Sequence, residues 1–258
     1  MKAISTFNQM GWYWNRLRCM SVSEIVGRAG KQASHAVARR RGPTSVPTAR
    51  FERAGARWLP REIPESAGQA VARANELLSG HWRIFARGAL PLGFPPEWNR
   101  NPDKGALLPM DFGKAMSFRD PAETGDIKYL WEPNRHLELV CLAQAWQLTS
   151  DMRYLEGIGT LLESWFVQCP YGLGPNWSSA LEAGIRLINW SIAWQLIGGL
   201  SSPLFQHPVG KVLRADWLSS IWRHAEFIRG HQSRHSSANN HLIGELTGLF
   251  VAGSTWPY

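Results

Sequence analysis

The chain has 258 residues, of which 44% are apolar and only 19% charged, which excludes wholesale disorder and allows one large domain or two small ones. The net charge of +8 points to a polyanionic partner: nucleic acid, a membrane surface or an acidic polysaccharide. Fourteen Trp do not choose among these partners, because indole rings stack on sugars and bases but also fill cores.

Cysteine usage and hydropathy restrict the class further. Cys19, Cys141 and Cys169 are too few and too far apart for a disulfide framework, and no CxxC pair suggests structural zinc. Residues 1–20 lack the apolar run of a signal peptide, and no stretch approaches 18 apolar residues, so we expect no transmembrane segment. The compartment stays open between bacterial cytoplasm and cell envelope or periplasm, and no cofactor is expected.

The positive charge is concentrated in residues 1–61. This segment holds 12 Lys or Arg and two acids, a net charge of +10, whereas the remaining 197 residues carry −2. Ser21-x-x-Glu24 is a capping box that begins a helix with apolar residues at helical spacing. The helix should end near Arg39–Arg41, before Gly-Pro. We interpret residues 1–61 as a basic N-terminal helix and linker.

Residues 62–130 form a second region. Apolar spacing predicts a helix over 66–79, closed by Gly80. Six prolines and several glycines then predict loops and short extended pieces over 80–126.

From residue 131 onward the pattern predicts paired helices. They are expected at about 134–149, at 152–168 after an Asp151 cap, from a Ser179-x-x-Glu182 capping box to Leu196, at 209–229, and from about Asn240 to Gly253. Helical hairpins in series predict a mainly α fold over 131–258, with 62–258 expected to be one domain. Because the chain stops soon after the last helix, we expect it to be truncated at the C-terminus.

The densest group of polar residues is at 222–241, which holds half of the eight histidines. Asn240 and His241 stand where a helix begins, so an amide, an imidazole and free backbone N–H groups could together bind a carboxylate. Arg234 and His235 precede them and could bind the same acidic group. The alternative is that Asn240 only caps the helix and His241 packs or meets solvent.

A metal site in this segment is not expected. His231-x-x-x-His235 has helical metal-binding spacing, but Gly230 should break the helix and the glutamate of an HExxH motif is absent.

A second candidate lies around the start of the helix that follows residue 179. Asn176 and Trp177 could bind a sugar, and Arg186 could face an acidic group beside Glu182. The alternative is a capping box with an intrahelical Glu182–Arg186 ion pair.

A third candidate is the segment Trp131-Glu-Pro-Asn-Arg135, which brings an indole and a guanidinium to a Pro-Asn helix start. The alternative is an ordinary amphipathic beginning of a helix.

Taken together and in their order along the chain, these three motifs resemble the N-terminal half of heparinase II/III-like polysaccharide lyases. The motifs that carry this resemblance are Trp131-Glu-Pro-x-Arg-His136, Asn176-Trp-Ser-Ser-Ala-Leu-Glu-x-x-Ile-Arg186 with Asn189-Trp190, and Asn240-His-Leu-x-x-Glu-x-x-Gly-Leu249. The resemblance is firm over about 125–253 and implies an incomplete (α/α) toroid. It also implies a β-sandwich domain that is absent from this chain.

The resemblance further implies β-elimination on uronic-acid-containing acidic polysaccharide, such as glycosaminoglycan or alginate. Asn240 and His241 then match the pair that contacts the substrate carboxylate, while Arg135, Trp131, Asn176, Trp177, Glu182 and Arg186 shape or support the cleft. The family's catalytic tyrosine lies several dozen residues after the Asn-His pair, but only 17 residues follow His241 and Tyr258 is their sole tyrosine. The chain alone is therefore expected to be inactive.

Two other hypotheses stand beside the lyase. One is a non-catalytic glycan-binding or structural helical domain, and the other is a less favoured nucleic-acid binder that acts through the basic N-terminus.

Overall fold

The computed structural model describes residues 14–15, 18–41, 55, 57–60, 68–116, 125–234 and 238–256. Contacts divide the chain into two units, Met1–Thr44 and Ser45–Tyr258. The expected domain boundary at residue 61 stays a prediction, although Trp58 already belongs to the second unit: its indole Nε1 donates to Thr255 Oγ1 at 3.0 Å.

The described structure of the first unit is dominated by helix α2, Val22–Arg41. The Ser21 hydroxyl accepts a hydrogen bond from the Glu24 backbone N–H at 3.2 Å, which is the hydroxyl half of the expected capping box. The helix bounds agree with the sequence prediction.

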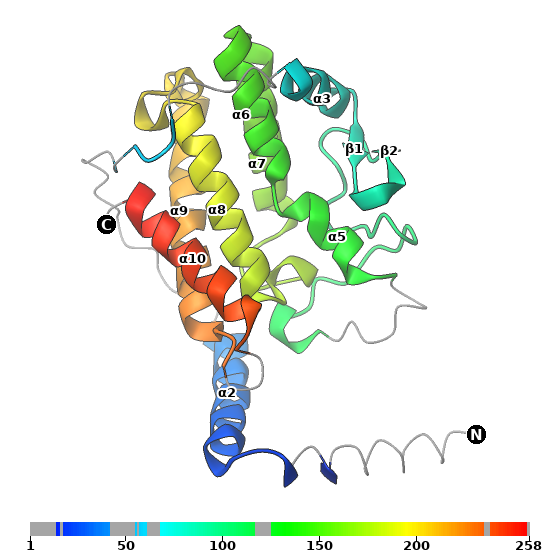
Figure 1. Cartoon of the computed structure of the whole chain (residues 1–258), viewed down its shortest axis with the longest axis vertical. Coiled ribbons are helices and arrows are strands. Elements are labelled where there is room, and N and C mark those ends of the chain that lie inside the picture. Colours follow the sequence, from blue (N-terminus) through cyan, green and yellow to red (C-terminus); the bar gives the residue numbers. More distant parts are fainter. Residues whose placement is uncertain are drawn as a thin grey trace. The chain divides into compact units, whose positions relative to one another are not determined.

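The second unit is built mainly of helices (Figure 1). Its helices are α3 (Gly68–Leu78), α5 (Ile127–Asn134), α6 (Leu137–Thr149), α7 (Met152–Gln168), α8 (Ala180–Leu196), α9 (Pro208–His231) and α10 (Asn240–Thr255). Strands β1 (His81–Arg83) and β2 (Ala89–Pro91) pair antiparallel in the Pro-rich segment. These pieces confirm loops and short extended segments there.

Helices α6 to α10 form two layers. In one layer α8 packs between α6 and α10, and in the other α7 packs against α9, so that α6–α7 and α8–α9 are hairpins across the layers. Asp151 begins α7 as expected, since its carboxylate accepts from the Arg153 N–H at 3.0 Å. The prediction of a mainly α fold made of helical hairpins is confirmed.

Helices α8 and α10 run side by side in the same direction (Figure 1). Near their starts, Gly184 lies against the backbone of Gly244 and Gly248. Near their ends, the rings of Trp194 and Trp256 are 5.8 Å apart, edge to face. Parallel packing therefore brings the first turns of both helices to one end of the layer.

The core between the layers is rich in indole rings. Eight of the 14 Trp are buried there or under the β-hairpin, namely Trp82, Trp98, Trp165, Trp177, Trp190, Trp194, Trp217 and Trp256. Most of the tryptophan in this chain thus serves packing.

The structure corrects the expected start of the helix at 134–149. Trp131 and Pro133 belong to the separate helix α5, and α6 begins only at Leu137. His136 between them has a left-handed backbone with φ 61°, which ends one helix direction and begins the next. Pro133 cannot donate a backbone N–H to the preceding turn, and α5 ends one residue later, at Asn134.

Two further boundaries differ from the sequence prediction. Gly230 does not end its helix, because α9 continues through His231. Ser179 precedes α8 but its hydroxyl caps no backbone N–H, and the expected capping box is therefore wrong. Among the described residues, no helix is both long and apolar enough to cross a membrane.

Candidate functional site

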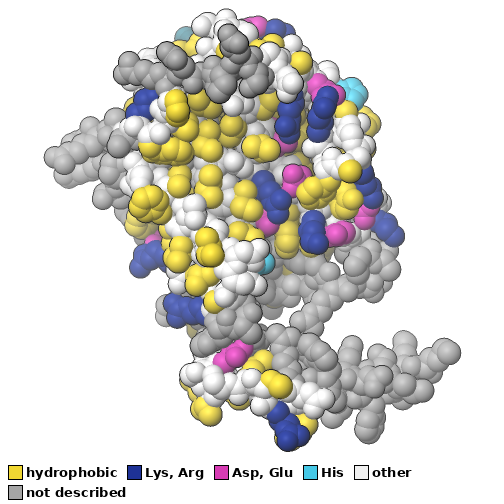
Figure 2. Space-filling view, in the orientation of Figure 1, with side chains coloured by type: hydrophobic (Ala, Val, Ile, Leu, Met, Phe, Trp, Pro, Cys, Tyr) yellow, Lys and Arg dark blue, Asp and Glu magenta, His cyan; other side chains and the backbone are white. Residues whose placement is uncertain are grey.

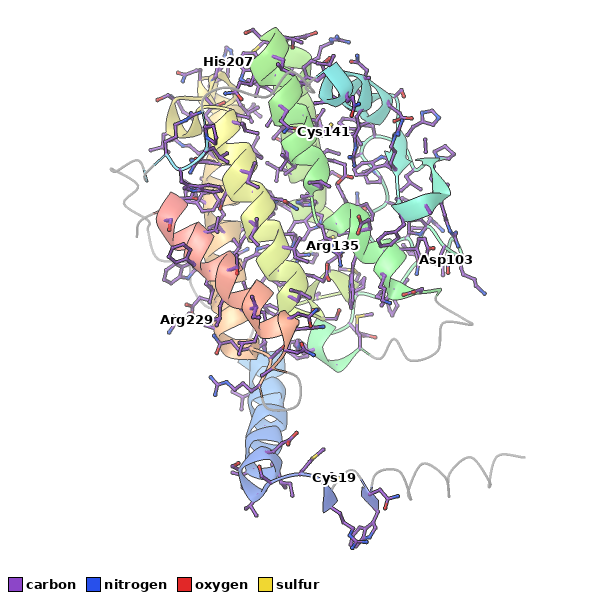
Figure 3. The ribbon with its side chains drawn as sticks, viewed as in Figure 1. Cys19, Asp103, Arg135, Cys141, His207 and Arg229 are labelled. Carbon is purple, nitrogen blue, oxygen red and sulfur yellow. The ribbon has the colours of Figure 1, made fainter. Side chains whose placement is uncertain are left out.

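Arg135 is the centre of an ion-pair cluster between α5 and α8 (Figure 3). Its guanidinium donates to both Glu182 oxygens, at 2.8 and 3.0 Å, and to Glu132 Oε2 at 2.7 Å. The Glu182 hydrogen bonds raise the pKa of Arg135. With two carboxylates around one cation, the cluster carries a net charge of −1, so Arg135 is already neutralised before any anion arrives.

Backbone contacts hold this cluster in place. Arg135 follows the last turn of α5, and its carbonyl accepts from Asn189 Nδ2 at 2.8 Å. Glu182 lies in the first turn of α8 with a side chain only 2% exposed, so the fork-to-fork geometry with Arg135 is largely shielded from water. Trp131, also on α5, joins this helix to the segment before α8, because its indole N–H donates to the Pro175 carbonyl at 3.2 Å.

Arg186, one turn further along α8, is fully buried and does not pair with Glu182. It donates to His224 Nε2 at 2.9 Å and to the Asn176 carbonyl at 2.8 Å. Its guanidinium carbon also lies 5.1 Å from the centre of the Trp165 ring. Burial lowers the pKa of Arg186 to about 10. The alternative interpretation, an intrahelical Glu182–Arg186 pair, is wrong, because each side chain finds a partner on another segment.

Two histidines face this arginine from within the core. His224 Nδ1 lies 2.7 Å from the Ser220 carbonyl and must donate to it, which leaves Nε2 as the acceptor from Arg186. His136 Nδ1 accepts from the Trp190 indole at 2.7 Å. Burial, and next to it the charge of Arg186, hold the pKa of both histidines well below the usual range. Both are therefore neutral structural groups.

Asn176 and Trp177 also lie inside the packed helices. Trp177 is 1% exposed and its indole donates to the Cys169 carbonyl at 3.1 Å, while Asn176 Nδ2 donates to Asn99 Oδ1 at 3.2 Å. Neither side chain has an exposed face for a sugar. The expectation that Trp177 stacks on a sugar and that Arg186 faces an acidic group is corrected by this burial.

The start of α10 presents the exposed polar residues of the site. Asn239 is the cap, since its side-chain oxygen accepts from the His241 backbone N–H at 3.0 Å. Asn240 and His241 both lie in the first helical turn and are exposed. The Asn240 side chain is therefore not used as the helix cap and can face a ligand.

Glu245, one turn into α10, anchors the segment that leads to this helix. Glu245 is 1% exposed, and its carboxylate accepts from the backbone N–H and the hydroxyl of Ser233, both at 2.7 Å. Arg234 follows Ser233 and is exposed. His235 lies outside the described residues, so its predicted role is not placed.

The two parts of the site lie at the same end of neighbouring helices. Leu181, which directly precedes Glu182 on α8, packs against Gly244 of α10 through its Cδ1. Gly184 of α8 lies beside Glu245 of α10. Figure 2 shows this face of the second unit, with apolar side chains spread over it and acidic and basic side chains grouped together to one side. Among the described residues, no group of His, Cys, Asp or Glu has the arrangement to hold a metal ion.

Sequence reasoning missed the buried polar residues on which the candidate site rests. His136, Asn134 and Glu245 lie within the recognised motifs, yet their spacing gave no sign of their partners. Asn134 accepts from Trp165 Nε1 at 2.9 Å and donates to the Trp98 carbonyl at 2.9 Å. The local sequence gave no sign of this buried polar network, because Trp98 and Trp165 lie 36 and 31 residues away from Asn134.

More than half of the chain matches a known protein family. Residues 96–258 match the sequence model of the family described as heparinase II/III N-terminus. No curated protein matches the chain.

Two solved structures share its fold. Heparan sulfate lyase HepC from Pedobacter heparinus, a mutant form, is 15% identical with a TM-score of 0.54, over 89% of this chain and 30% of that one. Heparinase III, the BT4657 gene product with methylated lysines, is 17% identical with a TM-score of 0.55, over 91% of this chain and 34% of that one. The chain thus spans about a third of the length of each structure.

Proposed function

Because the chain belongs to the heparinase II/III family, we propose that it is the helical portion of a lyase that cleaves uronic-acid-containing polysaccharide by β-elimination. The observation that carries this proposal is the exposed Asn240–His241 pair at the start of α10. Family membership supports a polysaccharide lyase as the parent, and the exposed pair supplies the matching chemistry.

The chemistry requires neutralisation of the substrate carboxylate. The C5 proton of a uronate is too weakly acidic to remove while the adjacent carboxylate keeps its full charge. The Asn240 amide and the His241 imidazole can both donate to that carboxylate, and the positive end of the α10 dipole favours the developing enolate-like charge. A general base then removes the proton, and an acid protonates the leaving glycosidic oxygen.

Arg135, Glu182 and Arg186 act as support in this proposal. Arg135 is held by Glu132 and Glu182, so it fixes α5 against α8 rather than binding the uronate. Arg186 ties α8 to the segment before it through the Asn176 carbonyl. Trp131 and the exposed Arg234 are proposed to border the sugar, the former at the α5 side and the latter before α10.

We further propose that binding of the polymer by this helical portion, through the exposed Asn240 and His241, is separable from its cleavage. Binding without cleavage is also what the alternative, a non-catalytic glycan-binding domain, would show. A longer form of the protein that produces unsaturated uronate, followed by its ultraviolet absorbance on heparan sulfate, alginate and bacterial exopolysaccharide, would distinguish the two.

The direct test is binding of uronate oligosaccharides by calorimetry. We expect His241→Ala and Asn240→Ala each to weaken binding by about tenfold, because each removes a hydrogen bond to a charged group worth about 1.5 kcal/mol or more. His207→Ala is the matched control, because His207 is an exposed histidine that precedes α9. All variants keep the basic N-terminus, so its general attraction for polyanions cancels in the comparison. Equal affinity of His241→Ala and wild type would exclude His241 from the site.

A further inference from the structure

Helix α2 is amphipathic, and its apolar side is exposed. At 100° per residue, seven of its eight apolar residues fall on one stripe about 120° wide, with only Ala38 outside it. The stripe consists of Val22, Ile25, Val26, Ala29, Ala33, Ala36 and Val37. All seven are exposed, Val22 at 78% and Val26 at 65%. Nothing in the described structure covers this stripe.

The same helix is strongly basic. Its sequence includes five cations against the single acid Glu24, and three of them, Arg39, Arg40 and Arg41, form its last turn. The surrounding segment, residues 1–61, carries +10 in total. Cations at the C-terminal end also suit the helix dipole.

The combination selects one kind of partner. Nucleic acid or an acidic polysaccharide would engage the positive charge but leave the apolar stripe in water. A bilayer with anionic headgroups accepts both, since an amphipathic helix lies in the interface with its apolar side at the acyl boundary and its cations among the headgroups. We propose that α2 binds an anionic membrane surface in this orientation and thereby attaches the chain to the bilayer.

This attachment is independent of the proposed glycan site, because it uses only residues of the first unit. The helix is too polar to span the bilayer, so the association is peripheral and reversible.

The test is co-sedimentation of the full chain with vesicles of phosphatidylcholine alone or of equal parts phosphatidylcholine and phosphatidylglycerol. We expect binding to the mixed vesicles only. Val26→Gln should weaken it about tenfold, since a valine side chain no longer enters the interface. Gly27→Gln is the matched control, because it adds the same side chain one residue along, on the polar side of the helix, and should leave binding unchanged.

Charge is tested separately. Replacing Arg39 and Arg41 together by Gln should weaken binding to the mixed vesicles by about 25-fold, at about fivefold per arginine. Failure of the wild-type chain to sediment with the mixed vesicles would overturn the proposal. Equal binding of the mixed vesicles by Val26→Gln and wild type would also overturn it, because the attraction would then depend on charge alone. The same holds if the chain binds duplex DNA or heparan sulfate more tightly than the vesicles and Val26→Gln does not change that affinity.

Discussion

At the scale of single residues, the polar groups of this protein divide into a buried set that holds the helices and an exposed set that is free to meet a ligand. Arg186 and His224 belong to the first set, where each completes the other's hydrogen bonding. Asn240 and His241 belong to the second. Substitutions in the buried set should therefore affect stability first, and substitutions in the exposed set should affect binding first.

Glu138 gives the sharpest test at this scale. It is buried on α6 with Arg73 3.8 Å away, and burial raises its pKa to about 7. At about pH 8 the folded chain therefore holds an unfavourable buried charge. Glu138→Gln removes that charge with little change of shape, so we expect the free energy of unfolding at this pH to rise by about 1–3 kcal/mol.

In the wild-type chain, three groups determine how the free energy of unfolding depends on pH. The unfolded chain takes up protons at His136 and His224 as pH falls through their ordinary value of 6.5, whereas the folded chain does not, so acid destabilises the fold. Glu138 acts in the opposite direction, since it protonates near 7 in the folded chain and near 4.5 in the unfolded chain. Between about pH 6 and pH 5 roughly one excess proton remains on the unfolded state, which lowers stability by about 1.4 kcal/mol per pH unit as pH falls.

Without the Glu138 proton the slope should double to about 2.7 kcal/mol per pH unit. Urea unfolding of both proteins between about pH 6 and pH 5, where the unfolded histidines are mostly protonated, measures it. Parallel curves for Glu138→Gln and wild type would show that Glu138 is ionised in both states.

At the scale of elements, the approach of α10 to α8 depends on residues without side chains. A Cβ at Gly248 would lie 2.6 Å from the Cα and 2.7 Å from the carbonyl oxygen of Gly184, and neither backbone atom can move aside without displacing a helix. This contact also positions the first turn of α10, where Asn240 and His241 lie.

Gly248→Ala should therefore destabilise the protein. We expect a loss of about 1–3 kcal/mol from steric overlap, larger than the gain of about 1 kcal/mol in helix propensity. Gly253→Ala is the control in the same helix, because a Cβ there meets nothing within 4 Å and only the gain should remain. Opposite shifts of the urea midpoint are the expected result, and shifts of the same sign would show that the helices are not packed this closely.

At the scale of the whole molecule, charge and core are divided between two units. Met1–Thr44 carries a net charge of +7 and Ser45–Tyr258 only +1, whereas the large buried side chains belong to the second unit. The total charge of +8 therefore describes neither the core nor the candidate glycan site.

Removal of residues 1–44 should leave the second unit folded. Because Ser45–Tyr258 contains its own core, we expect the truncated chain to unfold in one transition within about 2 °C of the full chain. Thermal unfolding followed by circular dichroism measures this. A much lower midpoint would mean that the first unit stabilises the second.

The sequence by itself determined the helices other than α5 and their order, because apolar spacing, Asp151 and the Gly and Pro positions act over a few residues. It also placed Asn240 and His241 at a helix start, through local capping chemistry. It could not assign partners across space. Glu182 pairs with Arg135, 47 residues away, and Arg186 with His224, 38 residues away, rather than with each other.

The tertiary structure alone decided which polar residues are exposed. Trp177 and Arg186 have the side chains of a sugar-binding site, but the packing of α8 against its neighbours places both in the core. Burial depends on the sum of contacts from many segments and leaves no mark in a short motif. For the same reason, the tryptophan count became meaningful only when eight of the 14 rings were found buried between the helical layers or under the β-hairpin.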